Sequence, residues 1–239
     1  MQNGSFEFST MDRDGWGPGT AWRLIRPGHS LGYMKPCVEN PVHANNANYM
    51  RLHIERAKEY YDYTGWTGIG IQNDGFDGIS VKAGEKYDFS AFMRNVIGDA
   101  KKVRVVLVEP IQGWPPKDPK LLAEATFDVN NKDWKQFEAV LTPNADCKNA
   151  ALQILVLTTG DMDIDVVSLM PQDTYKGHGL RKDLAQALAD LHPRFMRFPG
   201  GCVVHGGGDG FWNTYRWKTT IGPKKLRSEE RRVGKECRS

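Results

Sequence analysis

Arg197 and Cys202 enclose a Pro-Gly-Gly turn, and their types and spacing could serve ligand binding. An arginine guanidinium is planar, stays charged and satisfies two acceptors at once. In a barrel of alternating strands and helices, residues just past the carboxyl end of a strand line the active-site face. The turn is therefore a candidate site. The alternatives are an ordinary turn and, for Cys202, a small buried hydrophobe.

Two other motifs fail as sites. The glycine-rich segment 205–210 lacks the GxGxxG spacing and the following helix of a dinucleotide site, so we interpret it as a flexible loop. The alternating Asp161, Asp163 and Asp165 mimic a calcium loop but lack its glycine and its distal glutamate. Trp217 could stack on a ligand or pack beneath its loop.

The elements that would position the turn are a helix and a strand. Pro193 ends the helical pattern, and the aromatic segment Phe195 to Phe198 predicts a short strand that stops at Pro199. The helix itself is predicted by apolar residues at helical spacing: Leu180, Leu184, Ala187, Leu188 and Leu191.

Residues 1 to about 170 read instead as many short strands separated by Gly, Pro, Asn and Asp turns, which predicts an antiparallel sandwich of jelly-roll type. Thr10 to Ala47 is predicted to form long loops. Met162, Ile164 and Val166 should face a core, opposite the three aspartates. The predicted strands are Tyr49 to Glu55, Gly68 to Gln72, Gly78 to Val81, Tyr87 to Arg94, Val103 to Glu109, Leu121 to Val129, Trp134 to Leu141, Ala151 to Leu157 and Met162 to Leu169.

Beyond Pro171 the spacing of the apolar residues changes from a period of two to a period of 3.6 residues. We place a domain boundary there. The predicted fold is mainly β: a jelly-roll β-sandwich over 1–172, followed by a truncated piece of a (β/α)8 barrel over 173–226. An entire barrel usually needs roughly 250 residues.

Composition excludes few function classes. The chain has 239 residues, 40% of them hydrophobic, and a net charge of +3, which gives no indication of a nucleic-acid or membrane partner. Its four cysteines, Cys37, Cys147, Cys202 and Cys237, lack the short spacings of metal and redox sites and leave the compartment open.

Several segments resemble the α-L-arabinofuranosidases of glycoside hydrolase family 51, in the branch that carries an inserted β-sandwich. The resemblance spans nearly all of residues 1 to 226. It rests on NGSFEFS at Asn3, NDGFDGISVKAGEKYDFSAFMR at Asn73, DIDVVSLMPQDTYKG at Asp163, RKDLAQALADLHPRFMRFPGGCVV at Arg181 and YRWKTTIGP at Tyr215. It implies a retaining enzyme that releases terminal arabinofuranose from plant hemicellulose or arabinan.

Such an enzyme needs two carboxylates beside the scissile bond. In the family both are glutamates on later barrel strands, the acid/base within an Asn-Glu pair, and this sequence contains no Asn-Glu pair. No catalytic residue is therefore assigned, and the chain is predicted to be inactive. The resemblance places Arg197, Gly200, Gly201, Cys202 and Trp217 at the sugar-binding site. The expected partner is an arabinose-containing polysaccharide or oligosaccharide.

The sandwich also resembles carbohydrate-binding modules that hold a structural calcium between their first and last strands. Glu7 and Asp165 are the matching positions, and hard oxygen ligands suit calcium. A solvated face is the alternative. Catalysis by this family implies no cofactor. Loop aromatics offer a further sugar platform, whereas Trp134 is assigned to the core; the loop residues are Trp114, Tyr60, Tyr61, Tyr63 and Trp66.

The tail 227–239 departs from the resemblance. RSEERRVGKECRS has no apolar periodicity, and it matches one translated frame of a widely used short-read sequencing adapter. We therefore expect it to be a sequencing artefact.

Two further hypotheses compete with the enzyme fragment. Residues 1 to 170 could act as a carbohydrate-binding module by adhesion alone, or as a sandwich that braces the barrel and binds no sugar. The segment Gly179 to Pro223 discriminates against the first, because a free-standing module needs no barrel strand.

Overall fold

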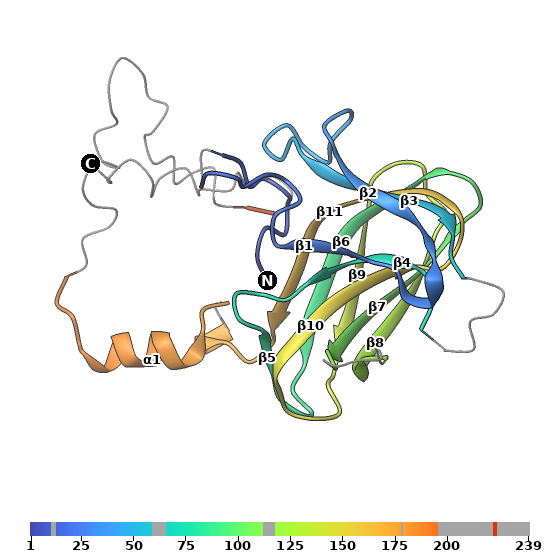
Figure 1. The fold of residues 1–239 in the computed structure, drawn as a ribbon. Coiled ribbons are helices and arrows are strands. Elements are labelled where there is room, and N and C mark those ends of the chain that lie inside the picture. Colours follow the sequence, from blue (N-terminus) through green and yellow to red (C-terminus); the bar gives the residue numbers. More distant parts are fainter. Residues whose placement is uncertain (11–12, 59–65, 112–117, 178, 196–221, 224–239) are drawn as a thin grey trace, which may run out of the picture.

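The computed structural model describes residues 1–10, 13–58, 66–111, 118–177, 179–195 and 222–223. In these ranges two antiparallel sheets pack face to face, with a separate helix after them (Figure 1). The six-stranded sheet runs β1-β4-β10-β7-β8, with β5 paired to β10, and the five-stranded sheet runs β2-β3-β11-β6-β9. The predicted antiparallel sandwich is confirmed.

The six-stranded sheet is built around nearly continuous apolar strands. In β7, Val103, Val105 and Leu107 enter the main core, whereas Val106 and Val108 join a second apolar cluster with Trp66 on the outer side. Strands buried on both faces have apolar residues at nearly successive positions, as Val105 to Val108 do here. The strands of this sheet are β1 (Trp22–Ile25), β4 (Ile69–Asn73), β5 (Ile79–Val81), β7 (Lys101–Glu109), β8 (Lys120–Val129) and β10 (Cys147–Val156).

The five-stranded sheet alternates instead. In β3, Met50, Leu52 and Ile54 face the core, while Arg51 and His53 point outward. This period of two is typical of a sheet with one apolar and one polar face. Its strands are β2 (Leu31–Cys37), β3 (Tyr49–Arg56), β6 (Tyr87–Ile97), β9 (Lys135–Leu141) and β11 (Gly160–Pro171).

All nine predicted strands are present, with ends shifted by a few residues. The prediction of long loops over Thr10 to Ala47 is wrong in part, because β1 and β2 lie within it. Each pairs along one edge of a sheet: Leu24 opposes Ile71, and Met34 opposes Leu52. β1 has only four residues, and β2 is an edge strand interrupted by Gly32 and Pro36, so both carry a weak periodic signal that the sequence does not reveal.

The alternation predicted for β11 fails at one position. Met162 and Ile164 face the core as expected, but Val166 does not join the core cluster, and Val167 takes that place. The register with β6 shifts between Asp165 and Ser168, and Val166 has a φ of 47°. A β-bulge adds one residue to a strand and so reverses the faces that follow it.

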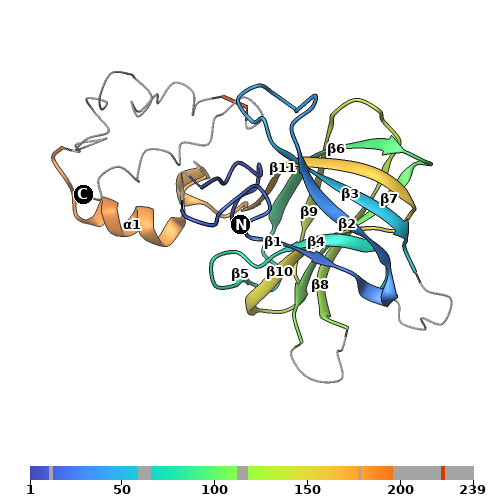
Figure 2. The same cartoon turned by 45° about the horizontal axis from the view of Figure 1, so that its top comes forward.

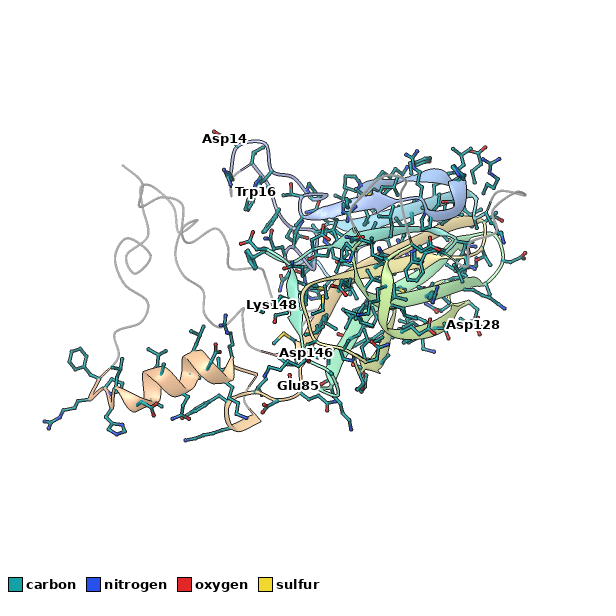
Figure 3. The ribbon with its side chains drawn as sticks, turned by 60° about the horizontal axis from the view of Figure 1, so that its bottom comes forward. Asp14, Trp16, Glu85, Asp128, Asp146 and Lys148 are labelled. Atoms are coloured by element: carbon teal, nitrogen blue, oxygen red, sulfur yellow. The ribbon has the colours of Figure 1, made fainter. Side chains whose placement is uncertain are left out.

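The chain leaves the sandwich at the end where Glu85 and Asp146 lie (Figure 3). Gln172 N donates to Lys86 O at 2.9 Å, and the chain then forms a single helical turn, η2 (Tyr175–Gly177), and the helix α1 (Lys182–Asp190). Figures 1 and 2 both show α1 standing apart from the sheets. The predicted helix is confirmed, and none of its residues is buried. Of the predicted strand after it, only Phe195 is described, exposed and outside any strand.

No helix in the described ranges is long and apolar enough to cross a membrane. The truncated barrel piece is not evident among these residues, since α1 is the only barrel-like element that they contain. The predicted strand and turn from Met196 to Cys202 lie outside them.

Candidate functional site

The outer face of the five-stranded sheet carries a row of basic residues beside a row of acidic residues. Strand β3 places Arg51 and His53 outward, and β11 places Asp163 and Asp161 directly opposite them. Because cross-strand partners lie side by side on one face, each basic residue meets an acidic one. This face is the candidate site. We call it the charged face and define it by these four residues together with Arg94 and Tyr33.

Asp163 is the centre of the charged face. Its side chain is fully buried and accepts hydrogen bonds from Arg51 Nε at 2.6 Å, Arg51 Nη2 at 2.9 Å and Arg94 Nε at 2.9 Å. The hydrogen bond to Asp163 is the largest cause that raises the pKa of Arg51 above its already high value. A buried carboxylate needs such partners, because an uncompensated charge is costly away from water.

Aromatic rings close one end of the charged face. The Arg94 guanidinium lies 4.4 Å from the centre of the Trp134 ring, and its Nη2 donates to Tyr49 Oη at 3.3 Å. Tyr49 in turn donates to Glu39 O, and burial raises the pKa of its phenol. With Arg94 only 6% exposed, this end is a fixed structural network that a ligand does not reach.

The other end is open to solvent. His53 Nδ1 lies 2.6 Å from Asp161 Oδ1, and the Tyr33 ring stacks on the imidazole with 4.7 Å between ring centres. Tyr33 is 47% exposed, and the side chain of His53 is 34% exposed. An exposed ring beside an imidazole and a carboxylate offers an apolar face together with donors and acceptors, which suits a neutral, polar ligand.

A hollow of about 690 Å³ lies on the same sheet toward its β9 edge. Ser90 and Phe92 of β6 and Glu138 and Val140 of β9 form its floor, and Gly222 and Pro223 form part of its wall. Gln136 Nε2 donates to Glu138 Oε1 at 2.7 Å along this floor. Phe92, its outward aromatic residue, is only 8% exposed and presents little ring surface.

The predicted calcium residues lie in neighbouring segments. Val167 N donates to Gly4 O at 2.8 Å, which joins the segment before Glu7 to β11 just after Asp165. Both oxygens of Glu7 accept hydrogen bonds from Asn48, each at 2.7 Å. Asp165 is fully buried, and its Oδ1 accepts from Val166 N at 2.6 Å. Within the described ranges no group of three or more His, Cys, Asp or Glu side chains is arranged to hold a metal.

The predicted sugar-binding residues cannot be placed. Arg197, Gly200, Gly201, Cys202 and Trp217 all lie outside the described residues, as do the loop aromatics Tyr60, Tyr61, Tyr63 and Trp114.

Two aromatic predictions are wrong. Trp66 is 8% exposed in the apolar cluster beneath Arg104, with its Nε1 donating to Gln153, so it forms no sugar platform. Trp134 is not in the core but covers Arg94 on the outer face.

Sequence reasoning also missed the basic half of the charged face. Arg51 and His53 alternate with apolar residues in RLHIER, as the aspartates do in DMDID. The two patterns together would have predicted a cross-strand pairing of charges, had the register of β3 against β11 been known.

A model of the alpha-L-arabinofuranosidase 1 domain matches residues 187–235. Alpha-L-arabinofuranosidase 1 of Arabidopsis thaliana is 40% identical over 156 residues, covering 65% of this chain and 22% of that protein. The extracellular exo-alpha-L-arabinofuranosidase of Streptomyces chartreusis is 32% identical over 240 residues, covering 95% of this chain and 26% of that protein. The chain is related to the α-L-arabinofuranosidases of glycoside hydrolase family 51.

Among solved structures, an arabinose-bound family 51 α-L-arabinofuranosidase superposes with a TM-score of 0.74 at 22% identity, over 95% of this chain and 35% of that one. This likeness shows a shared fold. The chain spans about a quarter of the length of the curated α-L-arabinofuranosidases that it matches. The domain match runs to residue 235, inside the tail that we expect to be an artefact, and the origin of that tail stays a prediction.

Proposed function

We propose that this chain is part of a retaining α-L-arabinofuranosidase that releases terminal arabinofuranose from plant hemicellulose or arabinan. The observation that carries the proposal is the match to the Streptomyces enzyme across 95% of the chain, from the sandwich into the segment matched by the arabinofuranosidase domain. A free-standing binding module would have no reason to resemble the enzyme beyond Pro171.

The segment 173–226 is a partial catalytic barrel in this proposal, comprising a helix and the second strand region. Helix α1 supports it, because Leu184 and Leu188 lie on one side of the helix and are 55% and 58% exposed. An apolar stripe of this kind is typical of a helix that packs on a larger core. Arg197, Gly200, Gly201, Cys202 and Trp217 would then border the arabinofuranose.

A hydrolysis assay on this chain and on an extended chain tests the proposal. The chain as given should not hydrolyse an aryl α-L-arabinofuranoside, because it lacks the acid/base and nucleophile pair. A chain extended with the downstream glutamates should hydrolyse it with retention at the anomeric carbon, which NMR of the first product detects. Inversion, or no activity in the extended and folded chain, would refute the proposal.

A structural calcium between Glu7 and Asp165 is a further part of the proposal. Both residues offer only oxygen donors, as calcium prefers, and their segments are joined through Gly4 and Val167. Added calcium should raise the melting temperature of the chain after treatment with EDTA, and this rise should be lost in Glu7→Gln. An equal rise in the variant would exclude Glu7 as a ligand.

The alternative function is carbohydrate binding without catalysis. The exposed Tyr33 beside His53 and Asp161 favours it. Affinity electrophoresis in arabinoxylan and arabinan gels tests it: retardation that Tyr33→Ala abolishes, while exposed Val38→Ala leaves it unchanged, would support a binding module.

A further inference from the structure

On the outer surface of β6 and β9, one outward apolar side chain is buried and its neighbour is exposed. Phe92 points away from the main core and belongs to neither apolar cluster, yet it is only 8% exposed. Val140, on the neighbouring strand, is 51% exposed.

Two residues from far along the sequence lie at the same hollow. Gly222 and Pro223 line the same hollow as Phe92 and Val140, although about 80 residues separate Val140 from them. Both belong to the segment matched by the arabinofuranosidase domain. Gly222 and Pro223 therefore lie at this surface of the sandwich.

We propose that the surface formed by Ser90, Phe92, Glu138 and Val140 is the docking face for the segment of this chain that contains Gly222 and Pro223. It fixes the sandwich against the arabinofuranosidase domain. This inference concerns how the two parts are held together and stands whether or not the enzyme activity proposed above is correct.

The chemistry of the hollow favours a polypeptide over a sugar. A sugar gains most from the exposed face of an aromatic ring, and Phe92 is too buried to provide one. A proline ring and a glycine backbone need only a shallow apolar floor with polar edges. Val140 supplies the exposed apolar surface, and Ser90 and Glu138 supply the polar edges.

Site-directed crosslinking tests the docking face in the whole 239-residue chain. In a background with Cys202→Ser and Cys237→Ser, cysteines are introduced as the pair Val140→Cys and Pro223→Cys. The remaining Cys37 and Cys147 are buried. The matched control pairs Pro223→Cys with Thr126→Cys, an exposed residue of similar size on the edge strand β8 of the other sheet.

A short bis-maleimide, added to dilute monomer, should link the Val140→Cys, Pro223→Cys pair several-fold more efficiently than the Thr126→Cys, Pro223→Cys pair, as peptide mapping by mass spectrometry measures. Circular dichroism establishes that both double variants are folded. Equal yields for the two pairs, or none for the first, would overturn the proposal.

A second measurement distinguishes a sugar site. The rate at which maleimide modifies the single variant Val140→Cys should not change when arabinoxylan oligosaccharides are added. Protection of the thiol in Val140→Cys by the sugar, with no protection in Thr126→Cys, would identify the hollow as a sugar-binding groove and would also overturn the docking face.

Discussion

The two sheets of the sandwich are both covered on the outside, but by different chemistry. The six-stranded sheet places a small apolar cluster there, in which Trp66 packs on Val106, Val108, Ala151 and Leu155. The five-stranded sheet places ions there, with Asp163 between Arg51 and Arg94. Apolar packing stabilises through the area that it removes from water, whereas a buried ion cluster depends on every partner being present. The sheets should therefore respond differently to the loss of one group.

The largest effect is expected at the centre of the charged face. Asp163→Ala leaves two arginines beside a site without a counter-charge, so it should lower the free energy of unfolding by about 3 to 5 kcal/mol, as urea denaturation measures. The control Asp173→Ala removes an ion pair with Lys182 whose side chains are more than half exposed, and should cost less than about 1 kcal/mol. If the two variants lose similar stability, the charged face is no more than a surface ion pair.

A smaller effect is expected from replacing the tryptophan on the outer face of each sheet. Trp66→Phe removes the donor to Gln153 Oε1 in a buried hydrogen bond and should cost about 1 to 3 kcal/mol. Trp134→Phe removes an exposed hydrogen bond to Asn40 O but keeps an aromatic face over Arg94, so it should cost less. Thermal melts of both variants measure this order, and the reverse order would show that Trp134 is the more important cover.

The sequence predicts features that depend on neighbouring residues, and it does not predict contacts between residues far apart in the chain. The nine strands are predictable, because alternation and turn residues are local, and the helix over α1 is predictable for the same reason. The pairing of Arg51 with Asp163 is not, since 112 residues separate them and only the register brings them together. The position of Trp66 depends likewise on its contact with Gln153 on β10. No glycine lies next to Val166 in the sequence to indicate the bulge there.

The smallest expected effect concerns a lysine near the charged face. Lys101 is fully buried at the start of β7, and its Nζ donates to Asp99 O at 2.5 Å. Burial lowers the pKa of Lys101, and the nearby Lys132 lowers it further. The folded protein thus binds this proton less tightly than the unfolded chain does.

The sign of the pH dependence follows from that difference. The cost of burying the charged Lys101 is fully present below its folded pKa. It falls as the pH rises toward the unfolded value of about 10.4, because the unfolded chain then holds more protons than the folded one. Lys101→Met removes this titration, so its free energy of unfolding relative to the unmodified chain should decline from neutral to alkaline pH.

Denaturation of both proteins at a series of pH values between neutrality and the unfolded pKa measures that decline. The matched control is Lys102→Met, which removes the exposed lysine at the neighbouring position and gives the baseline for that decline. A constant difference for Lys101→Met would mean that the Lys101 ammonium keeps water around it in the folded state. The six-stranded sheet would then tolerate a charge at the end of β7 without the charged partners that Asp163 requires in the five-stranded sheet.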